Sequence, residues 1–340
     1  MVCWDPASAK KNRTNPTDVP SIFYRPPADR LGAALIKPDA RAPRVLFVAL
    51  SNIGDLVLTT PALQAVHAAY PDHLIDIVAD IRSSELLRAC PYLGTLHHRH
   101  KAEGLRGTLR LIATLRTQSY AAIVDLRTDF LPWLLKGARR TARWRRPPHG
   151  PHAAEQHFAI ASRVLPSAEN IPDAQVWIAS SDLEFAENFL RPAAAGRWLA
   201  LAPGANWPGK IWPAAYFAEL IERVADTFSG VMIFGSAQDR PVAAHLGHGC
   251  RLPCLNLAGT TSLTQAAALL DHVTVFVGND SGLGHIAAAR GVPTLTLFGP
   301  GRPERYRPWG SKARLLQAPN RNLTALRASD VEAELRAIIH

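Results

Sequence analysis

The stretch Arg44-Val-Leu-Phe-Val-Ala-Leu50, followed at once by Ser51-Asn-Ile-Gly-Asp55, decides the fold class of this chain. Its continuous run of β-branched and apolar residues is typical of a parallel strand that is buried on both faces. The polar turn after it leads into a helical pattern that has Pro61 near its start. A strand that enters a helix through a short polar turn is the repeating unit of an open parallel sheet.

The same alternation of strand and helix continues on both sides of a break near residues 166–175. Further apolar strand patterns lie at Leu74–Ala79, Tyr120–Asp125, Trp198–Ala202, Val231–Phe234, Val273–Val277 and Thr294–Phe298. We therefore predict an α/β protein with two Rossmann-like βαβ domains that face each other across a cleft, with ligands at the carboxyl ends of the strands. The predicted boundaries are a Pro-rich extension over 1–43, an acceptor-side domain over 44–172 and a donor domain over 173–340.

The charge composition predicts an anionic partner. The 340 residues include 38 Lys and Arg against 28 Asp and Glu, which gives a net charge of +10. Such an excess suits nucleic acid, a phosphate-bearing substrate or an acidic lipid surface. Four scattered cysteines predict reduced thiols rather than a disulfide framework. No apolar run reaches the ~20 residues of a membrane span, and residues 1–43 lack the apolar core of a signal peptide, so we expect a cytoplasmic location.

Two glycine-containing turns after predicted strands carry charged side chains. In the turn after the first strand, Asp55 suits a general base toward a sugar hydroxyl, and it equally suits an N-cap of the following helix. The turn that begins at Pro203 combines glycines with Lys210 before a helix, which are the parts needed to hold a diphosphate. A surface loop with a solvated lysine explains that second turn equally well.

Two further turns follow strands in the second series. In Gly278-Asn-Asp-Ser-Gly-Leu-Gly-His285, Asp280 and Ser281 can cap a helix whose free N–H groups would bind a phosphate. His285 can donate to a phosphate oxygen, although a histidine within a helix is commonly structural. The turn at Phe298–Pro300 is expected at the same edge of the sheet.

The run Lys136–Arg146 holds six cations and no acid. Such a run is commonly the solvated face of a helix. Because Trp144 lies within it, the run also suits an anionic lipid head group, phosphates or a nucleic acid backbone. No helix-turn-helix, RRM, KH or zinc-finger pattern accompanies it, so we do not expect nucleic acid as a partner.

Three of these motifs, in this order, resemble the signatures of glycosyltransferase family 9, the ADP-heptose:lipopolysaccharide heptosyltransferases. The first is LFVALSNIGDLVLTTP at Leu46–Pro61. The second is Pro-Gly-Ala followed by Lys-x-Trp-Pro, within Pro203–Pro213. The third is Asp-Ser-Gly-x-x-His-x-Ala-Ala at Asp280–Ala288, with a later Phe-Gly-Pro turn. Asn206 and Ser281 depart from the family pattern, because many members carry Thr or Ser at the first position and Thr at the second.

The resemblance implies a GT-B fold and an inverting transfer of heptose from ADP-L-glycero-D-manno-heptose to a lipopolysaccharide inner-core acceptor that carries Kdo or heptose. It implies that Asp55 is the general base and that the reaction requires no metal or other cofactor. The implied donor-binding residues are Asn206, Lys210, Gln238, Asp239, Asp280, Ser281, Gly282 and His285. The acceptor- or anion-binding residues expected in the basic run are Lys136, Arg139, Arg140 and Arg143. The expected partners are ADP-heptose, an anionic glycolipid and, peripherally, the cytoplasmic face of the inner membrane.

Two alternatives remain open from the sequence. The same fold and chemistry would also serve another sugar nucleotide or an acceptor other than lipopolysaccharide. A non-catalytic protein that binds lipid A or another polyanion would keep the two-domain scaffold and the basic run without turning over any sugar nucleotide.

Overall fold

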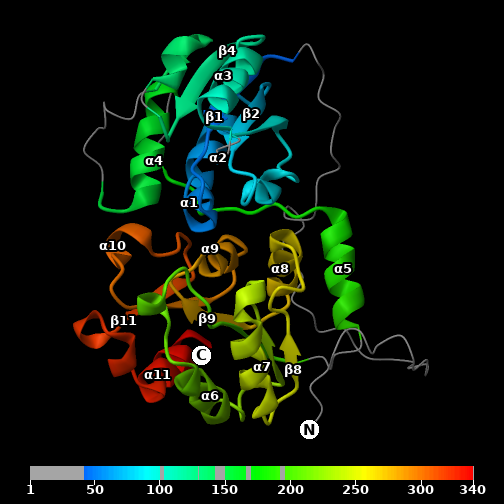
Figure 1. Cartoon of the computed structure of the whole chain (residues 1–340), viewed down its shortest axis with the longest axis vertical. Coiled ribbons are helices and arrows are strands. Elements are labelled where there is room, and N and C mark those ends of the chain that lie inside the picture. The colour runs from blue at the N-terminus through cyan, green and yellow to red at the C-terminus, as the bar shows by residue number, and fades with distance from the viewer. Residues whose placement is uncertain are drawn as a thin grey trace. The chain divides into compact units, whose positions relative to one another are not determined.

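The computed structural model describes residues 42–99, 103–128, 130–141, 150–165, 170–191 and 196–339. These residues form two compact units, each built on one parallel sheet (Figure 1). One unit holds the described residues up to Ala179 together with Glu304–Gly310, and the other holds Ser180–Pro303 and the described residues from Ser311 onward. Of the predicted Pro-rich extension, residues 1–41 lie outside the described part of the chain.

The first unit contains a five-stranded parallel sheet in the order β3-β2-β1-β4-β5. Its strands are β1 (Arg44–Val48), β2 (Leu74–Ala79), β3 (Leu93–His98), β4 (Ser119–Asp125) and β5 (Lys136–Arg140). Its helices are α1 (Ile53–Val57), α2 (Thr60–Ala69), α3 (Gly104–Leu115) and α4 (Ala153–Ala161), with the 3₁₀ turns η3 (Ser84–Leu87), η5 (Leu131–Leu134) and η6 (Ser162–Val164). The apolar residues of β1 are buried because β1 is the central strand.

The second unit contains a six-stranded parallel sheet in the order β11-β10-β9-β6-β7-β8. Its strands are β6 (Trp198–Ala202), β7 (Gly230–Ile233), β8 (Cys254–Asn256), β9 (Val275–Asn279), β10 (Thr294–Phe298) and β11 (Ala313–Gln317). Its helices include α5 (Ser180–Leu190), α6 (Ala214–Arg223), α7 (Arg240–His248), α8 (Leu263–Leu270), α9 (Gly282–Ala289) and α11 (Ala328–Ile339), with the 3₁₀ turns η7 (Pro208–Lys210) and η8 (Ala237–Asp239). Both sheets have Rossmann-like strand orders, so the predicted α/β fold class is confirmed.

The strand order reverses at one point in each sheet, between β1 and β4 in the first and between β6 and β9 in the second. Connections on the two sides of such a switch point diverge, and open α/β sheets bind their ligands there, at the carboxyl ends of the strands. The turn that carries Asp55 follows β1. The turn that carries Lys210 follows β6, and Asp280 follows β9. The predicted motifs therefore lie at the switch points of the two sheets.

The short segment Glu304–Gly310, which includes most of α10 (Pro303–Tyr306), belongs to the first unit despite its late position in the chain. Trp309 donates a hydrogen bond from its indole Nε1 to the carbonyl of Pro172 at 2.9 Å. His152, at the N-cap of α4, contacts the carbonyl of Arg307 through Nε2 at 2.9 Å. These bonds fix the segment to α4 and to the chain that follows it.

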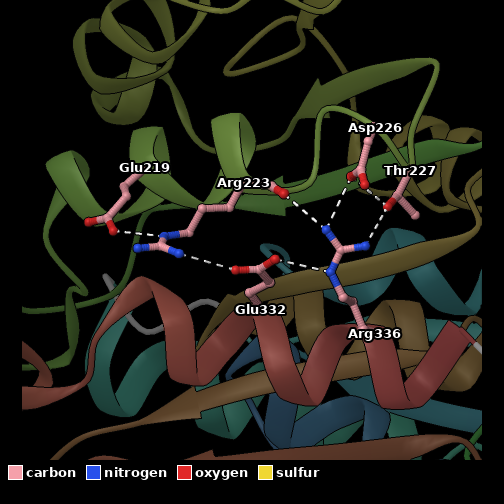
Figure 2. A network of polar contacts seen from close by, with 6 residues as sticks. All are labelled: Glu219, Arg223, Asp226, Thr227, Glu332 and Arg336. Atoms are coloured by element: carbon pink, nitrogen blue, oxygen red, sulfur yellow. Dashed lines mark hydrogen bonds and ion pairs between the residues drawn. The ribbon is translucent and has the colours of Figure 1, made fainter.

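Helix α11 is attached to α6 by a network of charged side chains, which Figure 2 shows. Arg336 of α11 contacts Glu332 at 3.0 Å and Asp226 at 3.1 Å, and Arg223 of α6 reaches Glu332 at 3.4 Å. Partly exposed pairs of this kind contribute little individually. Most of the stabilisation comes from the apolar core that both helices share, which includes Phe217, Leu220, Val331 and Leu335.

A buried ion pair joins the carboxyl ends of α8 and α9. Asp271 and Arg290 stand at the C-cap positions of these helices, and their side chains are only 5% and 3% exposed. Arg290 donates from Nε to Oδ1 at 2.8 Å and from Nη2 to Oδ2 at 2.5 Å. This two-pronged geometry fixes the position of α9, whose amino end lies at the switch point of the sheet.

Replacing Arg290 with Met leaves the carboxylate of Asp271 buried without its partner charge. We expect the free energy of unfolding, measured by urea denaturation, to fall by about 3–5 kcal/mol. The matched control is Arg314→Met, because Arg314 is 56% exposed and pairs with Glu334 at 3.4 Å. The control is expected to change stability by less than about 1 kcal/mol. Equal losses in the two variants would contradict a structural role for the buried pair.

Candidate functional site

One buried amide, that of Asn279, holds two turns of the second unit together, the segment after β6 and the turn after β9. Asn279 is the last residue of β9 and is fully buried. Its Nδ2 donates to the carbonyl of Pro203 at 2.7 Å, and its Oδ1 accepts from the backbone N–H of Trp212 at 3.0 Å. The glycine-containing segment after β6 begins at Pro203 and ends at Trp212. One side chain therefore fixes both ends of that segment against the carboxyl end of β9.

Lys210 lies inside this segment, at the end of η7, and pairs with Asp280, the residue after Asn279. Its ammonium lies 2.5 Å from Oδ2 of Asp280. The side chain of Lys210 is 24% exposed and that of Asp280 is 9% exposed. Lys210 is therefore not a solvated surface lysine. The ion pair holds its positive charge beside the amino end of α9.

Helix α9 begins directly after this ion pair, with Gly282 as its first residue and Ser281 at the N-cap. The Ser281 side chain makes no capping hydrogen bond, and its buried hydroxyl has no partner among the described residues. The expected capping by Asp280 and Ser281 is thus not made by either side chain, because Asp280 pairs with Lys210. The first N–H groups of a helix have no partner within the helix, so this end of α9 presents several donors to an anion. His285 lies one turn further along and is 5% exposed.

The remaining predicted donor-side residues lie on adjoining turns. Asp239, in η8 after β7, accepts hydrogen bonds at 2.7 Å from both the N–H and the hydroxyl of Ser236, so its carboxylate closes its own turn. A Cβ at Gly204 would lie 2.3 Å from Oδ1 of Asp239, so the glycine lets this carboxylate approach the segment after β6. Gln238 and Asn206 are exposed on these two turns.

In the first unit, Asp55 lies within α1, the short helix at the switch point. Asn52 occupies the N-cap and donates from Nδ2 to Oδ2 of Asp55 at 2.9 Å. Asp55 is in the first turn of the helix and not at the cap, so the N-cap alternative does not describe its position. Its side chain is half-buried and is oriented by the Asn52 amide.

His157 of α4 packs behind this helix and is 8% exposed. Its Nδ1 donates to the carbonyl of Leu58, the C-cap of α1, at 3.1 Å. Burial lowers the pKa of His157 to about 4, which the hydrogen bond to Leu58 and the charge of Asp55 only partly offset. The imidazole is therefore neutral at neutral pH, and its single Nδ1 proton anchors the end of the helix that carries Asp55.

Three arginines lie at the same edge of the first sheet, and the motif analysis missed them. Arg82, Arg99 and Arg127 follow β2, β3 and β4 at their carboxyl ends. Burial first, and then the positive charge of Arg99, lowers the pKa of Arg127, whereas Asp80 and Asp125 partly offset the effect. Arg127 is thus within electrostatic range of Arg99 and Arg82, and Arg82 is itself paired with Asp80 at 2.9 Å. The available sequence signal was a repeated Asp-x-Arg pattern, at 80–82 and again at 125–127.

The predicted basic residues Lys136, Arg139 and Arg140 lie on β5, an edge strand rather than a helix, and all three are exposed. In the register of the two strands, Lys136 lies opposite Ser119, at the amino end of β4. Asp55 lies at the other end of the strands, after the carboxyl end of β1. Arg143 lies outside the described residues.

Among the described residues, no group of three or more His, Cys, Asp or Glu side chains is arranged to share a metal ion. No helix in this part of the chain is long and apolar enough to cross a membrane. The described cysteines, Cys90, Cys250 and Cys254, are buried and form no disulfide with one another.

The burial of His157 predicts that the free energy of unfolding decreases as the pH falls. The unfolded imidazole binds a proton near pH 6.5 and the folded one only near pH 4, so stability present above pH 6.5 is lost as the pH falls toward 4. This residue accounts for about 3 kcal/mol of the loss. His157→Gln keeps a donor for Leu58 but does not titrate, so its stability should fall less steeply over this range. Urea unfolding at a series of pH values measures the difference.

The control for that series is His248→Gln, which changes an exposed histidine of the second unit. Its stability should follow the same pH profile as the unmodified protein. If the His157 and His248 variants gave parallel curves, the buried neutral imidazole would be excluded as a source of acid sensitivity.

Comparison with known proteins gives a consistent result. The sequence model described as glycosyltransferase family 9 (heptosyltransferase) matches residues 136–335. Lipooligosaccharide heptosyltransferase 2 of Haemophilus influenzae is 29% identical over 320 residues, covering 85% of this chain and 92% of that protein. Lipopolysaccharide heptosyltransferase 2 of Escherichia coli is 27% identical over 306 residues, covering 81% and 88%. The solved structure of E. coli ADP-heptose lps heptosyltransferase II has a TM-score of 0.73 and 25% identity, covering 87% of this chain and 98% of that one.

Proposed function

Since this chain belongs to glycosyltransferase family 9 and is a glycosyltransferase with the GT-B fold, we propose that it transfers a heptose from ADP-heptose to the inner core of lipopolysaccharide. The names of its relatives support ADP-heptose as the donor and lipopolysaccharide as the acceptor. The observation that carries the proposal is the Lys210–Asp280 ion pair at the amino end of α9, next to the unpartnered hydroxyl of Ser281. The non-catalytic alternative is not favoured, because the family is one of enzymes.

The donor proposal depends on the charge balance at this turn. A diphosphate needs several hydrogen-bond donors and a positive charge, and the α9 amino end, the Ser281 hydroxyl and Lys210 supply them. The carboxylate of Asp280 would repel a diphosphate by itself, but the ammonium of Lys210 neutralises it. We assign Asn206, Gln238, Asp239, Gly282 and His285 to the same donor site as the residues on the adjoining turns and in α9.

The proposed reaction is a single in-line displacement. Asp55 accepts the proton of the acceptor hydroxyl as that oxygen attacks the anomeric carbon of the heptose. The bond between this carbon and the β-phosphate oxygen breaks, ADP leaves with the electron pair, and the anomeric configuration inverts. Lys210 and the first N–H groups of α9 stabilise the negative charge that develops on the leaving group. We propose that these groups supply the positive charge that a metal ion supplies elsewhere, with no metal or other cofactor.

We propose that the acceptor binds through its anionic groups. Arg82, Arg99 and Arg127 lie at the sheet edge that carries Asp55, and guanidinium groups bind carboxylates and phosphates with two parallel hydrogen bonds. Lys136, Arg139, Arg140 and Arg143 form a second proposed set, which binds the charged glycolipid away from the reacting sugar. Because the donor is water-soluble and the acceptor is anchored in lipid, we propose a cytoplasmic enzyme that contacts the inner membrane peripherally.

Lys210→Ala removes the positive charge beside α9 and leaves Asp280 to repel the diphosphate. We expect ADP binding, measured by calorimetry, to weaken by about 10- to 100-fold, since hydrogen bonds to charged groups contribute about 1.5–3 kcal/mol. The matched control is Lys312→Ala. Lys312 is exposed at the amino end of β11, the opposite edge of the same sheet. Unchanged ADP affinity in Lys210→Ala would remove Lys210 from the donor site.

Asp55→Asn preserves the size of the side chain but removes the proposed base. We expect the rate of ADP release from ADP-heptose, in the presence of a lipopolysaccharide inner-core acceptor, to fall by about 10²–10⁴-fold, with donor affinity nearly unchanged. The matched control is Asp72→Asn, because Asp72 is exposed just before the amino end of β2.

A panel with GDP- and UDP-sugars run beside ADP-heptose tests the donor. Faster release from one of these sugars would contradict the proposed donor.

A further inference from the structure

Exposed apolar side chains are concentrated on one part of the first unit. Among the described residues, eight large apolar side chains are exposed, and five of them lie on α3 and around η5. These five are Leu105 (74% exposed), Leu109 (57%), Phe130 (60%), Trp133 (55%) and Leu134 (38%). Single exposed apolar residues are normal on a soluble protein, but a concentration of this kind marks an interaction surface.

The two segments belong to one face because they cover the same core. Ile112 and Leu115 of α3 and Leu131 of η5 are buried in a single apolar cluster. Arg116, which ends α3, donates from Nε to the carbonyl of Leu134 at 2.8 Å. On α3, Leu109 follows Leu105 by four residues and Ile112 follows Leu109 by three, so the apolar stripe continues from the core into solvent.

The charged residues of this face are almost all cationic. Residues 103–119 and 130–141 contain the single acid Glu103, which pairs with Arg110 at 2.9 Å. The exposed cations on these residues are Arg106, Arg110, Arg116, Lys136, Arg139 and Arg140. The guanidinium of Arg140 lies over the ring of Trp133, 5.7 Å from its centroid, so an aromatic side chain and a cation point to solvent together.

We propose that α3, η5 and the edge strand β5 form a docking surface for an anionic lipid bilayer. Leucine and tryptophan side chains enter the boundary between head groups and acyl chains, while flanking arginines and lysines contact lipid phosphates. A water-soluble polyanion would use the cations but would leave Leu105 and Leu109 exposed to water. This inference rests on the proposed function in one respect: an acceptor anchored in lipid is the reason for the protein to bind a bilayer.

The test is flotation of the full-length protein with vesicles of phosphatidylglycerol and phosphatidylcholine in equal parts, and with phosphatidylcholine alone. Binding is expected only to the anionic vesicles and should weaken as salt is added. Lys136→Gln combined with Arg140→Gln should reduce binding by about 30-fold, since each cation near an anionic surface contributes about 1 kcal/mol. Leu105→Ser combined with Leu109→Ser should reduce it by about tenfold or more.

The matched control is Arg251→Gln combined with Arg314→Gln, which removes the same charge from the second unit at side chains that are 72% and 56% exposed. It should change vesicle binding by less than about twofold. Equal losses in the control, or no loss in the leucine variant, would overturn the proposal and leave only unspecific attraction of a basic protein. Urea unfolding of each variant checks that the fold is intact.

A second copy of the chain is the other occupant that this face suits. Light scattering over a range of protein concentrations separates the two. A dimer that Leu105→Ser and Leu109→Ser dissociate, without any vesicle binding, would overturn the proposal in favour of self-association. Because flotation uses neither donor nor acceptor, its failure would leave the proposed transfer reaction untouched. A failure of ADP release would in turn leave the docking surface untouched.

Discussion

The geometry of the proposed donor site depends on the amide of Asn279. This side chain is fully buried and must donate to one backbone group and accept from another, the carbonyl of Pro203 and the N–H of Trp212. An aspartate could not make both bonds, because an ionised carboxylate only accepts. With both ends of the intervening segment fixed to β9, Lys210 reaches Asp280, and the ion pair follows from the position of the amide.

The two parallel sheets explain why residues far apart in the chain become neighbours. In each sheet the strand order reverses beside the first strand, so the turns after two strands that are distant in sequence leave from adjacent positions. The fold thereby brings Pro203 to Asn279 in one sheet and places the Asp55 turn next to the Asp125 turn in the other. The side chains on these turns differ between the two sheets, but the reversal of strand order brings the turns together in both.

The sequence predicted the central strands well and the edge strands poorly. β6 and β10 have the predicted bounds because each is a continuous apolar run, which a strand buried on both faces requires. The four edge strands, β3, β5, β8 and β11, were all missed. An edge strand has a neighbour on one side only and tolerates polar residues such as those of Lys136–Arg140, and β8 has only three residues. Because β5 is rich in cations, its sequence resembled the solvated face of a helix, and the strand was not predicted.

The same contrast separates the candidate site residues that were predicted from those that were missed. Lys210 and Asp280 belong to local patterns of glycine, charge and a following helix, and such patterns are visible along the chain. The Asn279 bonds, by contrast, connect a side chain to backbone groups, which any residue type supplies. Arg82 and Arg127 become a cluster only through the order of β2, β1 and β4 in the sheet. Local patterns therefore predict single turns, whereas the sheet topology decides which turns act together.

The net charge of +10 has no single meaning in this structure, because its cations lie in three different environments. Lys210 is partly buried and neutralised by a carboxylate, so the proposed anionic ligand would compete with Asp280 for it. Arg127 is partly desolvated beside other arginines, which favours an anion at that position regardless of the protein's total charge. Arg140 is exposed over an aromatic ring, where a surface charge acts through long-range attraction that salt weakens. A fixed ligand geometry thus belongs to the first two environments, and only the third suits a surface as variable as a membrane.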